Sequence, residues 1–80
     1  MDIFELNRKE IKEKQAFLYK LYLKKLDELI ETNRMVDDPL AGPNANKAGK
    51  LMNAFKSNNY TTMDRFRTDF EEIRLKIEQI

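Results

Sequence analysis

Closely spaced carboxylates are the first side chains in this sequence that could do chemistry. Glu28 and Glu31 lie three residues apart, and Glu71 and Glu72 are adjacent. Two such groups can act as an acid–base pair when their surroundings move their pKa values apart. The chain has no histidine and no cysteine, which excludes the common zinc sites and thiol chemistry. We therefore interpret both pairs as solvated helix surface, and we expect no enzyme, no cofactor, no metal and no small-molecule substrate.

A glycine–lysine pair is the second candidate, because such pairs occur in phosphate-binding loops. The segment Ala48-Gly49-Lys50 contains the pair. It lacks the glycine five residues before Gly49 and the serine or threonine after Lys50 that complete the loop. The sequence therefore does not predict a nucleotide site.

Lysines on one outer face of the first predicted helix could neutralise phosphates, and lysines of the second helix could extend that surface. The net charge is only +1, from 15 basic and 14 acidic residues, which gives no general attraction to nucleic acid. Asp27 and Glu31 also continue the line of Lys20 and Lys24 along the helix. We favour a solvated lysine-rich face and keep a nucleic-acid-associated regulator as the alternative. The lysines of this alternative are Lys9, Lys20, Lys24, Lys47 and Lys50.

The apolar residues are spaced as in helices along the whole sequence, and no segment shows the alternation typical of strands. Helices must therefore position the charged groups described above. The chain is 80 residues long, which suits a single small domain. The fold class is all-α: a helical hairpin elaborated to a three-helix bundle, with the last helix antiparallel to the first. The expected elements are a long helix over about 3–34, a Pro/Gly connection over 37–44, a short helix over 45–56 and a third helix over 61–80.

Local signals set these boundaries. Pro43 should interrupt the helical conformation, and Asn44 should cap the second helix. Gly49 lies inside that helix and costs about 1 kcal/mol relative to alanine, which indicates a packing reason or a weak helix. Thr61, followed by Asp64, fits a capping box at the start of the third helix.

The third predicted helix carries an uninterrupted heptad seam that reaches the last residue. Its large apolar residues are spaced alternately three and four apart. An antiparallel first helix would offer this end only its sparsely apolar first third. The seam can pack within the monomer, against a second copy, or both, and we predict a homodimer. The seam residues are Met63, Phe66, Phe70, Ile73, Ile77 and Ile80, and the last four form the predicted self-association interface.

The middle of the first predicted helix is apolar nearly all round, which indicates contacts on more than one side. Phe17 and Leu23 lie off the main apolar stripe of this helix, and Tyr19 lies on its flank. The main apolar stripe consists of Phe4, Ile11, Leu18, Tyr22, Leu26 and Leu29. These three residues are our candidates for binding a partner protein, although aromatic residues in the middle of a helix also serve as core.

The expected function is non-enzymatic protein binding by a small adaptor, regulator or inhibitor of the type common among products of phages and other mobile elements. The first ten residues lack the basic-then-apolar profile of a signal peptide. The apolar run Ala16–Leu23 is interrupted by Lys20 and is too short to span a membrane. We therefore expect a cytoplasmic protein with no membrane partner.

Overall fold

The structure is a computed structural model that describes residues 3–33 and 38–80. It has a long axis of 49 Å and is 17 × 16 Å across. The described residues contain helices and no strand, which confirms the predicted all-α class. The helices are α1 (Ile3–Leu6), α2 (Arg8–Glu31), α4 (Ala41–Ser57) and α5 (Met63–Glu78).

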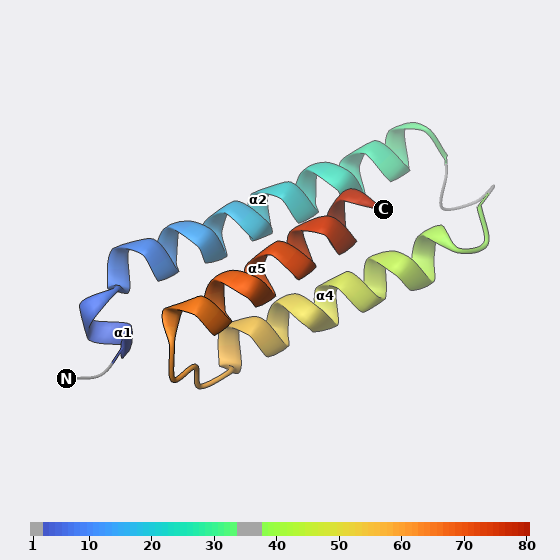
Figure 1. Cartoon of the computed structure of the whole chain (residues 1–80). Helices are drawn as coiled ribbons and strands as arrows, with labels where there is room; N and C mark the ends of the chain where they lie inside the picture. Colours follow the sequence, from blue (N-terminus) through green and yellow to red (C-terminus); the bar gives the residue numbers. More distant parts are fainter. Residues whose placement is uncertain (1–2, 34–37) are drawn as a thin grey trace.

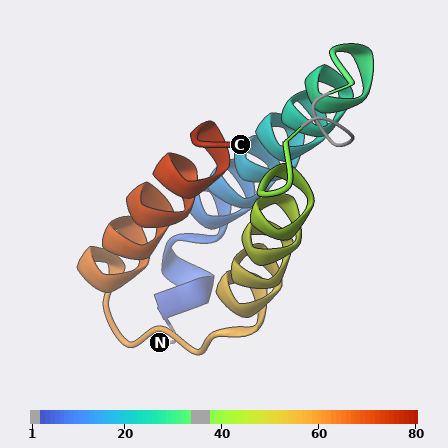
Figure 2. The same cartoon turned by 90° about the vertical axis from the view of Figure 1, so that its right-hand side faces the viewer.

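The three long helices run up, down and up, and each packs on the other two (Figure 1). Viewed from the end, they form a triangle around a single core (Figure 2). The helix α5 is therefore parallel to α2, and the prediction that it is antiparallel to the first helix is wrong. The physical reason is that α4 is long enough to return the chain to the start of α2. The short connection 58–62 then reverses the direction once more.

The first predicted helix is shorter than the expected 3–34 and is broken once. Asn7 has a non-helical backbone (φ −121°, ψ 24°) that separates α1 from α2. At the other end, the Thr32 side chain donates to the Glu28 carbonyl, 2.7 Å away. Asn33 then adopts the left-handed conformation (φ 56°), which commonly ends a helix. Arg34, the last residue of the predicted helix, lies outside the described residues.

The helix α4 begins four residues before the predicted start at 45. The Leu40 N–H donates to the Asp38 carboxylate at 2.9 Å, and this turn leads directly into the helix. Pro43 lies in the first turn, where a backbone N–H has no partner within the helix, so a proline does not interrupt it. The predicted break at Pro43 and the predicted cap at Asn44 are both wrong. Residue 37 of the predicted connection lies outside the described residues.

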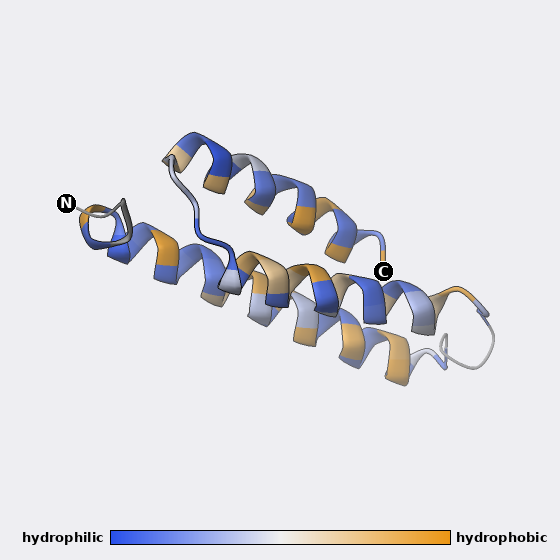
Figure 3. Ribbon diagram, turned by 90° about the horizontal axis from the view of Figure 1, so that it is seen from below, coloured by the Kyte–Doolittle hydropathy of each residue, from blue (hydrophilic) through white to orange (hydrophobic). Residues whose placement is uncertain are grey.

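The core of the bundle is aromatic at one end and narrow at the other. Near the α4–α5 connection, the rings of Phe55 and Phe66 stack with centroids 4.7 Å apart, and Tyr60 meets Phe66 edge-on at 5.5 Å. Toward the other end, the buried face of α4 consists of Ala41, Ala45 and Ala48, which lets α4 approach its neighbours closely. Figure 3 shows that the hydrophobic segments of α5 face the other two helices.

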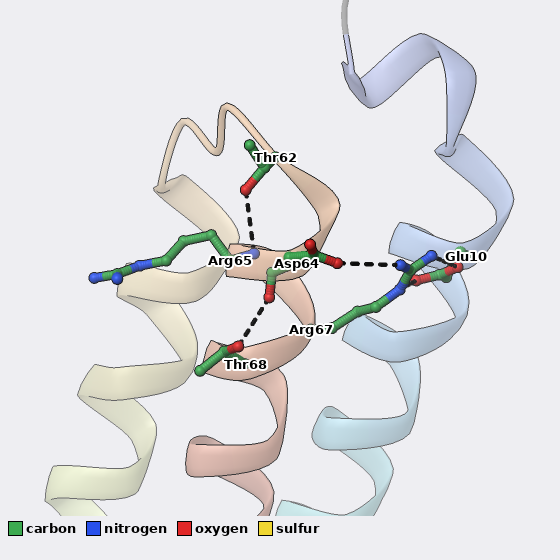
Figure 4. A network of polar contacts seen from close by, with 6 residues as sticks. All are labelled: Glu10, Thr62, Asp64, Arg65, Arg67 and Thr68. Carbon is green, nitrogen blue, oxygen red and sulfur yellow. Dashed lines mark hydrogen bonds and ion pairs between the residues drawn. The ribbon is translucent and has the colours of Figure 1, made fainter.

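The start of α5 is capped by Thr62 and not by Thr61 as predicted. The Thr62 hydroxyl accepts from the Arg65 N–H at 3.3 Å, and Thr68 donates to the Asp64 carbonyl at 2.9 Å (Figure 4). Thr62 has the extended backbone (φ −139°, ψ 150°) that a capping residue adopts. The sequence therefore predicted correctly that a threonine caps this helix, but it placed the cap one residue too early.

A two-pronged ion pair joins the starts of α2 and α5. The Arg67 Nε and Nη2 donate to the two carboxylate oxygens of Glu10 at 2.8 and 2.9 Å. The hydrogen bond to Arg67 lowers the pKa of Glu10. An exposed pair of this kind contributes little stability, but its planar geometry is specific. It is consistent with the parallel register of the two helices (Figure 4).

Ile77 should be a major contributor to stability, because its side chain is 0% exposed. We expect Ile77→Ala to lower the free energy of unfolding by about 2–5 kcal/mol, through lost burial and the cavity left behind. Leu75 lies on the same helix but is 49% exposed, so Leu75→Ala should change it by less than about 0.5 kcal/mol. Urea unfolding followed by circular dichroism measures both. Equal effects would contradict the placement of the seam.

Gly49 provides the close approach that the sequence indicated. A β-carbon at this position would lie 3.0 Å from the Tyr22 hydroxyl oxygen, which donates to the Ala45 carbonyl at 2.9 Å. The ring carbon that bears the hydroxyl would be 3.5 Å away, an ordinary contact. The hydroxyl of Tyr22 is thus the group that disfavours a β-carbon at this position.

A double-mutant cycle tests this requirement. In the Tyr22→Phe background, Gly49→Ala should stabilise the protein by about 1 kcal/mol, the gain in helix propensity. In the wild type that gain should be cancelled, because the tyrosine must move and weaken its hydrogen bond. Thermal unfolding of the four proteins gives the coupling energy. A gain of the same size in both backgrounds would show that the hydroxyl imposes no constraint.

Tyr60 should make the stability of the fold depend on pH in the alkaline range. Burial, together with a 2.7 Å hydrogen bond donated to Asp69, raises the pKa of Tyr60 to about 12 from its ordinary value of 10.0. Its contribution is therefore complete below pH 10 and is lost as the pH rises toward 12, where the unfolded chain releases the proton first. Tyr60→Phe should flatten the decline in unfolding midpoint over this range. An identical decline in both proteins would contradict the assignment.

Candidate functional site

The residues predicted for self-association lie inside the monomer. Ile77 is fully buried, and the other three are at most 8% exposed; all belong to the core that α5 forms with α2 and α4. Because α5 is parallel to α2, its end lies beside the apolar middle of α2 and not beside the sparse first third. These residues therefore offer no exposed surface to a second copy, and the argument that they need one is wrong. The residues are Phe70, Ile73, Ile77 and Ile80.

The three partner-binding candidates divide between two sides of α2. The ring of Phe17 lies 5.9 Å from that of Phe70, so it partly covers the α2–α5 seam, with Lys14 also placed over Phe70 at 4.6 Å. Tyr19 and Leu23 lie one turn apart on another face and are 58% and 42% exposed. Tyr19 and Leu23 thus share a surface, and Phe17 is not part of it.

The shared surface continues to the end of α2. Leu26 is partly buried, and Ile30 is 65% exposed. Figure 3 shows hydrophobic segments along the edge of the C-terminal half of α2 that points away from α5. The sequence reasoning missed Ile30, although the spacing carried the signal. We call Tyr19, Leu23, Leu26 and Ile30, spaced four, three and four apart, the α2 stripe.

A groove of about 500 Å³ lies between the first half of α2 and the last half of α4. Its floor includes the buried Leu18 and Phe55, and Tyr19 links it to the α2 stripe. The hydrogen bond from the Tyr22 hydroxyl to the Ala45 carbonyl sets the antiparallel register of the two helices. In this register the start of α2 lies opposite the end of α4. The lining contains two lysines and no acidic residue. The residues lining this α2–α4 groove are Lys12, Gln15, Ala16, Leu18, Tyr19, Met52, Asn53, Phe55 and Lys56.

The lysines of the nucleic-acid alternative do not form one surface. Lys9, Lys20 and Lys24 are exposed on α2. Lys47 lines a small hollow between α4 and α5, and Lys50 follows it within one turn. The two groups therefore lie on different sides of the bundle, and the positive area that the sequence suggested is divided.

Comparison with known proteins does not identify the chain: no family model, no curated protein and no solved structure matches it. Within residues 3–33 and 38–80, every helix is too short or too polar to cross a membrane. The same residues contain no group of three side chains suited to holding a metal ion. The α2–α4 groove and the α2 stripe, which share Tyr19, are therefore the features from which a function can be argued.

Proposed function

We propose that this protein is a non-enzymatic protein-binding module, an adaptor, regulator or inhibitor of the cytoplasm, that binds a partner in the α2–α4 groove and also self-associates. The observation that carries the proposal is a groove with an apolar floor and a basic rim beside an exposed apolar stripe. Single exposed hydrophobic residues are ordinary on proteins, but several aligned on one helix are typical of an interaction surface.

The shape of the groove favours a side chain or short segment of another protein. Its volume of about 500 Å³ accommodates several apolar side chains, and its walls are formed by the two long helices α2 and α4. Met52 lies in the wall, where its flexible thioether can adapt to an inserted group. An amphipathic helix lying along such a groove is a recurring mode of recognition.

The charges of the groove favour an acidic partner. Lys12 and Lys56 reach it from the two walls, and no carboxylate of the chain is among its lining residues. Neither lysine forms an ion pair with another described residue. A partner carboxylate between them would gain two charge-assisted contacts and an on-rate that falls with salt.

Capture from an extract of the native host with matched variants tests this function. Lys12→Glu with Lys56→Glu should reduce retention of the specific partner about tenfold, because two attractive contacts become repulsive. The control, Lys47→Glu with Lys50→Glu, makes the same change in net charge on the other side of α4. Quantitative mass spectrometry of the retained proteins gives both ratios.

Two results would contradict the proposal. Equal loss of the partner with both double variants would show a general charge effect and no groove site. Recovery of nucleic acid, with retention abolished by nuclease and falling steeply with salt, would favour the nucleic-acid-associated regulator, because counterion release makes phosphate binding strongly salt-dependent.

A further inference from the structure

We infer that the α2 stripe is the self-association surface, and that a second copy of this chain packs against it with the two α2 helices antiparallel. The inference rests on the self-association in the proposed function and names its surface and geometry. In place of the buried α5 seam, this surface offers three residues that are exposed in the monomer, Tyr19, Leu23 and Ile30, together with the partly buried Leu26.

The spacing of the stripe fits a helix as its occupant. Tyr19, Leu23, Leu26 and Ile30 repeat with the 4–3–4 spacing of coiled-coil core positions. They cover three turns of a helix whose neighbouring face, through Leu18 and Leu29, already lies in the core of the monomer. The helix α2 thus carries two apolar faces, of which only one is covered within the chain.

The charges beside the stripe identify the occupant as a second copy. Lys20 and Lys24 flank the first half of the stripe, and Asp27 and Glu31 flank the second half along the same edge. All four are exposed, and none forms an ion pair with another described residue. An edge that is positive at one end and negative at the other is complementary to itself when reversed.

The twofold axis of such a dimer would pass between Leu23 and Leu26. Each of these leucines then meets the other in the partner, and Tyr19 meets the partner's Ile30. In this register Lys20 lies beside the partner's Asp27, and the symmetry repeats the pair. In a parallel pairing this edge would face the other edge of the partner's stripe, so the Lys20–Asp27 pairs would not form; the charges therefore favour the antiparallel arrangement.

The surface is small, so the dimer should be weak. Three turns of one helix fall at the low end of the interface sizes found for specific complexes. We expect a dissociation constant in the range of about 1–100 μM, where monomer and dimer coexist and exchange rapidly. The α2–α4 groove of each copy lies mostly toward the outer end of the paired helices, beyond the central leucines.

Sedimentation equilibrium of the purified protein, without any partner, tests the inference. The wild type should dimerise with the stated affinity. Lys20→Glu or Asp27→Lys alone should raise the dissociation constant about tenfold, because each places two like-charge pairs in the interface. An equimolar mixture of these two variants should recover the wild-type affinity as a heterodimer, in which both pairs are again opposite in sign.

A second pair of variants tests the apolar part of the proposed dimer interface. Ile30→Asp should abolish the dimer, whereas Leu75→Asp, which changes an exposed leucine of α5, should leave it intact; circular dichroism confirms that both remain folded. A wild type that is monomeric up to millimolar concentration overturns the inference, as does a dimer that survives Ile30→Asp or a mixture with no heterodimer. Because no partner is present, these results are independent of partner capture by the groove.

Discussion

The burial of the α5 seam between α2 and α4 is the constraint on which the rest of the structure depends. A chain of 80 residues without cysteine has no disulfide to add to the stability of its small core. The seam supplies the largest share of buried apolar side chains, including Phe66 and Ile77, and it closes the triangle that the other two helices leave open. The alanine face of α4 and Gly49 contribute to this packing, because these small residues let α4 approach the other two helices closely.

This closure also determines which residues remain outside. The helix α2 has 24 residues, whereas α5 has 16, so one face of α2 cannot be covered by the third helix along its whole length. Packing of α4 on one side and α5 on the other buries Leu18 and Leu29 and leaves Leu23 and Ile30 exposed. The interaction surface that we propose is thus what remains of an apolar helix after the bundle has formed.

Helical class and the identity of the seam were predictable from the sequence, because heptad spacing depends only on the geometry of the helix. The direction of α5 was not, since it depends on how far α4 carries the chain before the turn. That single error led to the prediction that Ile77 and Ile80 need a second copy. The α4 boundary was missed for a local reason: Pro43 is compatible with a first turn, and periodicity does not distinguish a first turn from a break.

Some residues of the candidate site could be recognised from the sequence, but their arrangement could not. Leu23 was recognised as lying off the main apolar stripe and Tyr19 as lying on its flank, and the acidic Asp27 and Glu31 were seen to continue the line of Lys20 and Lys24. Their meaning depends on which face of α2 the other helices cover, which the sequence does not state. Ile30 was missed for that reason. The groove required the register of α2 against α4, which the Tyr22 hydrogen bond to Ala45 provides only in the folded chain.

Solvent paramagnetic relaxation of the isoleucine methyl groups tests the central claim most directly, because isoleucines mark both apolar faces. A soluble gadolinium chelate relaxes the methyl groups that it can approach. We predict that Ile73, Ile77 and Ile80 are protected at every protein concentration, whereas Ile30 is strongly relaxed in dilute solution and becomes protected as the concentration rises. Strong relaxation of Ile77 and Ile80 in dilute solution, or of Ile30 at all concentrations, would contradict it.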